Sequence, residues 1–134
     1  MKEITVEADV SKLPVVTEFV DALLEEKECP LKVQMQIDVA IDELFSNICY
    51  YAYDSSGDAT VCVNIDGEPM TAEITFKDKG RPYDPLKKPD PDITLSAEER
   101  DIGGLGIFMV KKSMDEVLYE YKDGMNILTI RKAF

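Results

Sequence analysis

The stretch Ile41-Asp42-Glu43-Leu44-Phe45-Ser46-Asn47 decides the fold of this 134-residue chain. It lies within residues 30–53, where apolar side chains recur at steps of three and four, the spacing that places them on one face of an α-helix. These apolar positions are Val33, Ile37, Ala40, Ile41, Leu44 and Ile48. The stretch therefore predicts a long helix that buries one face in the core.

Glu43 and Asn47 fall at the edge of that apolar face. At about 100° per residue they lie roughly 40° apart, one helical turn from each other. Asp42 lies roughly 140° from the centre of the face and is expected to point into solvent. A carboxylate and an amide stacked at such an edge suit a general base and a metal ligand. Two solvated side chains would give the same spacing, so the pattern alone leaves both interpretations open.

Other periodic segments surround this helix. Residues 14–28 repeat apolar side chains at helical spacing. Segments that alternate as strands do are residues 3–7, 60–65, 71–76, 117–121 and 126–131. The order β-α-α-β-β-loop-α-β-β predicts an α+β fold, a two-layer α/β sandwich with one mostly antiparallel sheet and helices on one face. We expect residues 1–134 to form a single domain.

The charge balance narrows the possible partners. The chain carries 27 acidic and 15 basic residues, a net charge of −12. Nucleic acid and anionic membrane surfaces bind clustered Lys and Arg, so neither is expected as the main partner. A polyanionic ligand would need help from backbone N–H groups, a few cations or a metal ion.

Cysteine and histidine usage narrow the chemistry further. The chain has no histidine, which excludes a Ser-His-Asp triad, a histidine metal site and a phospho-accepting histidine within it. Its three cysteines have no C-x-x-C spacing and are expected to be reduced thiols in or near the core. The N-terminus does not resemble a signal peptide, and no apolar run approaches membrane-spanning length, so we expect a cytoplasmic protein.

A second stretch with chemical potential is Lys77-Asp78-Lys79-Gly80-Arg81-Pro82, where a predicted strand ends. A buried carboxylate at Asp78 would accept a hydrogen bond from an exocyclic amine such as that of adenine. Gly80 would let the backbone approach a flat ring or adopt a positive φ. An ordinary turn explains the same residues. The aperiodic segment that follows, 78–101, is long for a connection and predicts a lid, a binding loop or a disordered segment.

A third stretch is Gly103-Gly104-Leu105-Gly106, directly before an apolar helix over residues 107–112. Helix N-termini present unpaired N–H groups and the positive end of the helix dipole, which suit phosphates. A tight packing turn is the alternative. The stretch is not a Walker A loop, because no G-K-[ST] follows, and Met109 replaces the last glycine of a Rossmann fingerprint.

Taken in order, the three stretches resemble the GHKL superfamily of ATP-binding domains, which includes gyrase, heat-shock chaperones, sensor histidine kinases and bacterial anti-sigma-factor serine kinases. The resemblance covers nearly the whole chain and is strongest to the serine kinase branch. The matching runs are Ile41-Asp42-Glu43-Leu44 with Asn47 and Ala52-Tyr53, Asp78 to Pro85, and Gly103 to Ile107 with Met114-Asp115-Glu116-Val117. The implied fold is the Bergerat-type ATP-binding fold.

The resemblance implies a role for each matched position in the first two stretches. Glu43 corresponds to the general base that polarises an attacking hydroxyl or water. Asn47 corresponds to the residue that coordinates Mg²⁺. Asp78 corresponds to the carboxylate that binds the adenine amino group, and Gly80 lies beside the ring.

The third stretch corresponds to the second glycine box, whose backbone holds the phosphates of ATP through Gly104, Leu105 and Gly106. Residues 84–102 correspond to the ATP lid, in which Lys87, Lys88 and Arg100 are candidate phosphate neighbours. Many relatives carry a glycine where this chain has Pro82, which offers no N–H. Lid contacts known from gyrase or chaperones are therefore not transferred to this chain.

The implied function is that of an ATP- and Mg²⁺-dependent serine/threonine protein kinase that acts as an anti-sigma factor. Its substrate would be an anti-sigma antagonist with a STAS domain, and it would also bind a sigma factor and form a homodimer. The sequence leaves two alternative functions open for this chain. One is a regulatory module that binds ATP or ADP and sequesters a partner protein without catalysis. The other is the ATP-binding half of a split histidine kinase.

Overall fold

The structure is a computed structural model that describes residues 1–87 and 105–134. Its helices and strands follow the predicted order, with two short 3₁₀ turns added. The elements are β1 (Lys2–Glu7), η1 (Val10–Lys12), α1 (Leu13–Glu26), α2 (Leu31–Tyr51), β2 (Asp58–Asp66), β3 (Thr71–Asp78), η2 (Pro85–Lys87), α3 (Leu105–Ser113), β4 (Glu116–Lys122) and β5 (Met125–Ala133). Both long helices therefore form close to their predicted ranges.

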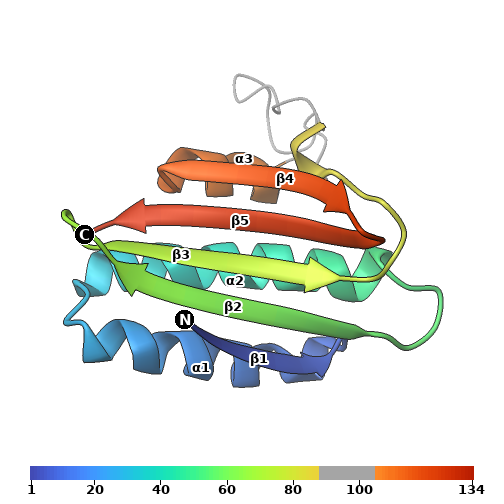
Figure 1. The fold of residues 1–134 in the computed structure, drawn as a ribbon, viewed down its shortest axis with the longest axis horizontal. Helices are drawn as coiled ribbons and strands as arrows, with labels where there is room; N and C mark the ends of the chain where they lie inside the picture. The colour runs from blue at the N-terminus through green and yellow to red at the C-terminus, as the bar shows by residue number, and fades with distance from the viewer. Residues whose placement is uncertain (88–104) are drawn as a thin grey trace.

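The strands form one five-stranded sheet in the order β1-β2-β3-β5-β4, and every neighbouring pair is antiparallel. The three α-helices lie together behind the sheet, with α2 between α1 and α3 (Figure 1). The α+β prediction, with helices on one face of an antiparallel sheet, is confirmed. Two layers of this kind leave the space between sheet and helices as the place where a ligand can be enclosed.

The core fills the interface between α2 and the sheet. From β3, Ala72, Ile74 and Phe76 point toward the helices at every second position, as the alternating pattern predicts. From α2, the predicted face is buried at Ile37, Ala40, Ile41 and Leu44. Phe45, which lies outside the predicted stripe, is fully buried as well. A helix covered on both sides by neighbouring helices buries a wider arc than its sequence pattern indicates.

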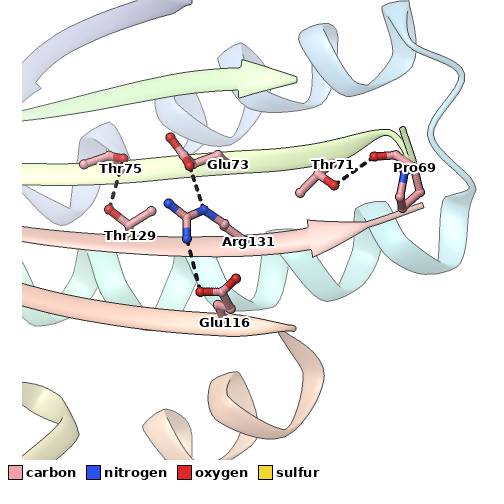
Figure 2. A network of polar contacts seen from close by, with 7 residues as sticks. All are labelled: Pro69, Thr71, Glu73, Thr75, Glu116, Thr129 and Arg131. Carbon is pink, nitrogen blue, oxygen red and sulfur yellow. Dashed lines mark hydrogen bonds and ion pairs between the residues drawn. The ribbon is translucent and has the colours of Figure 1, made fainter. Parts of the chain in front are cut away.

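The opposite face of the sheet is polar and open. Arg131 of β5 bridges Glu73 of β3 and Glu116 of β4, with N···O distances of 2.7 Å and 3.1 Å (Figure 2). Thr75 and Thr129 are hydrogen-bonded across the same two central strands at 3.2 Å (Figure 2). Cross-strand pairs of this kind stabilise an exposed sheet face modestly. The sheet thus has one buried face, as the alternation predicts.

The β4–β5 hairpin sets the register next to the site. Its turn residues Asp123 and Gly124 have φ values of 55° and 77°, the left-handed conformation that an Asp-Gly turn favours. The tight turn brings Asn126, near the start of β5, directly opposite Asp78 at the end of β3. Two polar residues on the inward side of the sheet therefore meet at one end of the helix layer.

The three cysteines lie where the sequence analysis expects them. Cys29 and Cys49 are half-buried, Cys62 is buried, and all three are free thiols. No helix in the described part of the chain has the length and apolarity that crossing a membrane would require.

Candidate active site

A mostly apolar pocket opens between the C-terminal half of α2 and the adjoining ends of β3 and β5. It encloses about 420 Å³, open mouth included. Its apolar lining consists mainly of Leu44, Ile48, Ala52, Phe76, Pro85 and Leu128. Three polar side chains also reach it, namely Asn47, Asp78 and Asn126. An apolar space lined by a few polar groups is typical of a site for a small ligand.

Asp78 provides the buried carboxylate that the sequence predicts. The residue is only 5% exposed. Its Oδ1 accepts hydrogen bonds from the backbone N–H of Gly80 and from Nδ2 of Asn126, each at 2.9 Å. Among the described residues, Oδ2 has no hydrogen-bond partner. Two donors satisfy Oδ1 and leave the other oxygen as an acceptor for a ligand.

Asn126 is a site residue that the sequence analysis missed. Its Nδ2 also donates to the carbonyl oxygen of Arg81 at 2.8 Å, and its Oδ1 accepts from the backbone N–H of Tyr83 at 3.0 Å. The hydroxyl of Tyr119 donates to the same Oδ1. A signal was present in the sequence, because Asn126 occupies the same inward side of its strand as the predicted core residues of β5.

Tyr119 is held in its neutral, donating form. Burial raises the pKa of the Tyr119 hydroxyl above its usual value, and nearby carboxylates, those of Asp84 and Asp78, raise it further. The hydroxyl therefore remains protonated throughout the neutral range. Its proton is available for the hydrogen bond to Asn126.

Gly80 does not line the pocket, although the resemblance implies a place beside the adenine ring. It is absent from the pocket lining, and its φ is not among the positive values of the chain. A Cβ at this position would overlap the carbonyl group of Ala52, at the end of α2. The N–H of Arg81 donates to that same carbonyl at 2.9 Å. The glycine thus allows the backbone after β3 to lie close to the end of α2. This contact fixes the chain two residues after Asp78.

Glu43 and Asn47 lie on α2 as predicted, both half-buried, whereas Asp42 is exposed. Nδ2 of Asn47 lies 3.4 Å from Oε1 of Glu43, a long hydrogen bond. This contact turns the amide nitrogen toward Glu43, so the carbonyl oxygen of Asn47 is left to face a ligand. Asn47 lines the pocket, and Glu43 lies one turn earlier along the helix.

Gly106 lies in the first turn of α3 and faces Glu43. A Cβ built on Gly106 would overlap both carboxylate oxygens of Glu43. The helix begins at Leu105, inside the glycine run rather than after it. Its N–H groups and positive dipole end therefore lie beside Glu43, where an anion is stabilised. Gly104 and the other residues of 88–104 lie outside the described chain, and the side chain of Leu105 is likewise not described.

The described part of the predicted lid is short. Asp84 caps the 3₁₀ turn through a 2.9 Å hydrogen bond from the N–H of Leu86 to its Oδ1. Lys87 is exposed at the end of this turn. Lys88 and Arg100, the other candidate phosphate neighbours, fall within the residues that are not described.

Contacts connect these groups in order, because Asp78 and Asn47 line one pocket, Asn47 is hydrogen-bonded to Glu43, and Glu43 faces Gly106. The Asp78 carboxylate stands at the pocket end, Asn47 lies between, and Glu43 with Gly106 stands at the other end. An elongated ligand with an amine at one end and phosphates at the other would match this order. The described residues contain no group of three or more Cys, Asp or Glu side chains able to hold a metal alone. One amide oxygen instead fits Mg²⁺ that takes its remaining ligands from phosphates and water.

Comparison with known proteins finds similarity to one family model and to named kinases. The model of the histidine kinase-like ATPase domain family matches residues 6–132. The serine/threonine-protein kinase BtrW of Bordetella bronchiseptica is 23% identical over 99 residues, which cover 74% of this chain and 70% of BtrW. The serine-protein kinase RsbW of Listeria monocytogenes is 25% identical over 96 residues, which cover 69% of this chain and 61% of RsbW.

Proposed function

Because this chain belongs to the histidine kinase-like ATPase domain family, we propose that it is an ATP-dependent serine/threonine protein kinase. The observation that carries the proposal is the connection between Asp78, Asn47 and Glu43, since the first two line one pocket and Asn47 is hydrogen-bonded to Glu43. Together with the first turn of α3, these residues would contact the adenine, the metal ion and the phosphates of bound ATP. The kinase names of BtrW and RsbW support the same reaction class.

The apolar pocket is the part of the site that would hold the adenine base. The adenine ring would lie between apolar side chains of α2 and the sheet, which include Leu44 and Phe76. Its exocyclic amine would donate to the free Oδ2 of Asp78. A mostly apolar pocket with one buried carboxylate acceptor favours a base with an amine at that position, because an unpaired buried carboxylate oxygen costs free energy.

The phosphate end lies where α3 begins. Backbone N–H groups of Leu105 and Gly106, with Gly104 before them, would hold the phosphates at the positive end of the helix dipole. Asn47 would give its amide oxygen to Mg²⁺, which when bound neutralises phosphate charge that this acidic protein does not itself offset. Both assignments use chemistry that the observed side chains and backbone can provide.

Glu43 would act as the general base. Its carboxylate takes the proton of a serine or threonine hydroxyl on the partner protein, and the hydroxyl oxygen forms a bond to the γ-phosphorus. The bond between the γ-phosphorus and the β–γ bridging oxygen breaks, and ADP leaves with that electron pair. The half-buried position of Glu43 at the helix edge leaves it open to an incoming hydroxyl.

The partner is proposed from the resemblance to the anti-sigma kinase branch. The substrate would be an anti-sigma antagonist with a STAS domain, and the kinase would also bind a sigma factor as an anti-sigma factor. Competition of the two partners for one surface would allow switching. A homodimer is proposed on the same ground.

The test is phosphate transfer from labelled ATP to STAS-domain proteins of the same organism. Transfer that survives acid and depends on Glu43 would support a serine or threonine kinase. Acid-labile transfer would instead indicate a histidine acceptor on another protein. Nucleotide binding with no transfer to any tested partner would favour a module that binds ATP or ADP and sequesters its partner.

A further inference from the structure

We propose that Asn126 determines which purine the pocket accepts, because it holds Asp78 with only an acceptor oxygen facing the base. The inference rests on the proposed nucleotide site and goes beyond it by assigning base selectivity to a second residue. Asn126 is 6% exposed and its backbone pairs directly with Asp78 in the sheet. It is therefore a positioning residue that acts through the carboxylate.

The orientation of the Asn126 amide is fixed by its four partners. Nδ2 faces two acceptors, Oδ1 of Asp78 and the carbonyl oxygen of Arg81, while Oδ1 faces two donors, the N–H of Tyr83 and the hydroxyl of Tyr119. Rotation by 180° would set donors against donors and acceptors against acceptors. Every hydrogen-bonding position of this amide is used, so it has one stable arrangement.

The orientation of the Asn126 amide decides which hydrogen-bonding group Asp78 offers to the purine base. With two donors on Oδ1, the Asp78 carboxylate has Oδ2 left as the hydrogen-bond acceptor for the base. Adenine offers a donor there, its exocyclic amine. Guanine and hypoxanthine offer a keto oxygen at the equivalent ring position, which would be repelled. A site that must leave a buried charged acceptor unpaired discriminates strongly against the wrong ring.

The same amide also shapes the wall of the pocket. Through the carbonyl of Arg81 and the N–H of Tyr83 it holds the backbone just before the 3₁₀ turn. Tyr83 lines the pocket, and its ring lies 5.6 Å from the ring of Tyr51 on α2. Loss of the Asn126 amide would therefore free the Asp78 carboxylate to move. It would also free the pocket wall at Tyr83.

The deciding experiment compares ADP with inosine diphosphate, which carries the keto group, in the wild type and in Asn126→Asp. In the variant two carboxylates face each other at the 2.9 Å contact, so one must hold a proton. We expect ADP affinity to fall about tenfold, and the ratio of ADP to inosine diphosphate affinity to fall by at least as much.

The controls separate the possible failures. Asn64→Asp adds the same charge on β2, outside the pocket lining, and should keep wild-type selectivity. If Asn126→Asp does not fold, Asn126→Ser takes its place and should also lose at least about threefold in selectivity. Unchanged selectivity in a folded variant overturns the inference while the nucleotide site stands. If the wild type binds neither nucleotide, the proposed function itself fails.

Discussion

The carboxylate of Glu43 lies directly against the Cα atom of Gly106, with no room between them for a Cβ atom. This contact joins the middle of α2 to the first turn of α3. It places Glu43, the proposed general base, at the positive end of a helix, beside the proposed phosphate site. The glycine at this position is therefore required by the packing of a charged side chain, which the sequence pattern alone does not reveal.

Gly106→Ala tests this contact. In a helix, alanine usually stabilises by up to about 1 kcal/mol relative to glycine. Here the added methyl group must displace the Glu43 carboxylate, so we expect phosphate transfer to fall by about 10² or more, without the usual gain in stability. Met109→Ala, at an exposed position of the same helix, is the matched control for a small change in α3. A Gly106→Ala protein with full transfer activity would show that the carboxylate does not need its observed place.

Glu43→Gln tests the proposed base. The amide keeps the size of the side chain but cannot take the proton of the acceptor hydroxyl. We expect transfer to fall by roughly 10²–10⁴ and ATP affinity to change less than about threefold. Initial rates at saturating ATP, together with calorimetric affinities, separate the two effects. Equal loss of binding and transfer would instead place Glu43 in nucleotide binding.

Asn47→Ala tests the proposed metal contact. Removal of the amide oxygen proposed to bind Mg²⁺ should weaken ATP binding in the presence of Mg²⁺ by about tenfold. Binding of ADP without metal should change little, since Asp78 and the pocket remain. The measurement is a pair of titrations with and without Mg²⁺. A variant that keeps the full Mg²⁺ effect would remove Asn47 from the metal site.

Asp38, which lies outside the pocket lining, makes the stability of the fold depend on pH. Its burial, then its hydrogen bond and charge interaction with Asp21 and the charge of Glu25, raise the pKa of Asp38 from 3.8 to about 7. The folded protein thus holds more protons than the unfolded chain between about pH 4 and about pH 7. The free energy of unfolding therefore falls as pH rises through that range.

Asp38→Asn should remove this loss. We expect the variant to be more stable than the wild type at about pH 8 by up to about 1 kcal/mol, and the difference to shrink at about pH 5. Thermal unfolding at both pH values measures it. Asp42→Asn, exposed on the same helix, is the control and should shift the melting temperature equally at both pH values. Identical behaviour of the two variants would contradict the assignment.

The sequence predicts much of the fold because its patterns are local. Alternation in β3 and helical spacing in α2 each depend on residues a few positions apart, and both were confirmed in range and in buried face. The Asp-Gly turn likewise specifies its own hairpin. What the patterns could not predict are contacts set by the sheet order, such as the pairing of Asp78 with Asn126 across 48 positions.

Gly80 and Gly106 show the same limit within the predicted site. The sequence marks each as a position of close backbone approach, which is correct. It does not say what approaches, and the structure places the end of α2 against one and the Glu43 carboxylate against the other. Partners of this kind follow from tertiary packing and have no spacing signature.

The most direct test of the nucleotide site is calorimetric titration with ATP, with and without Mg²⁺, of the wild type and of Asp78→Asn. Asp66→Asn, at an exposed strand end, is the matched control. We predict Mg²⁺-dependent binding by the wild type and the control, and a loss of about tenfold or more in Asp78→Asn. ATP at about 100 times its Kd should also stabilise the fold by roughly 2.7 kcal/mol. No binding at millimolar nucleotide, or equal binding by Asp78→Asn, would contradict the account.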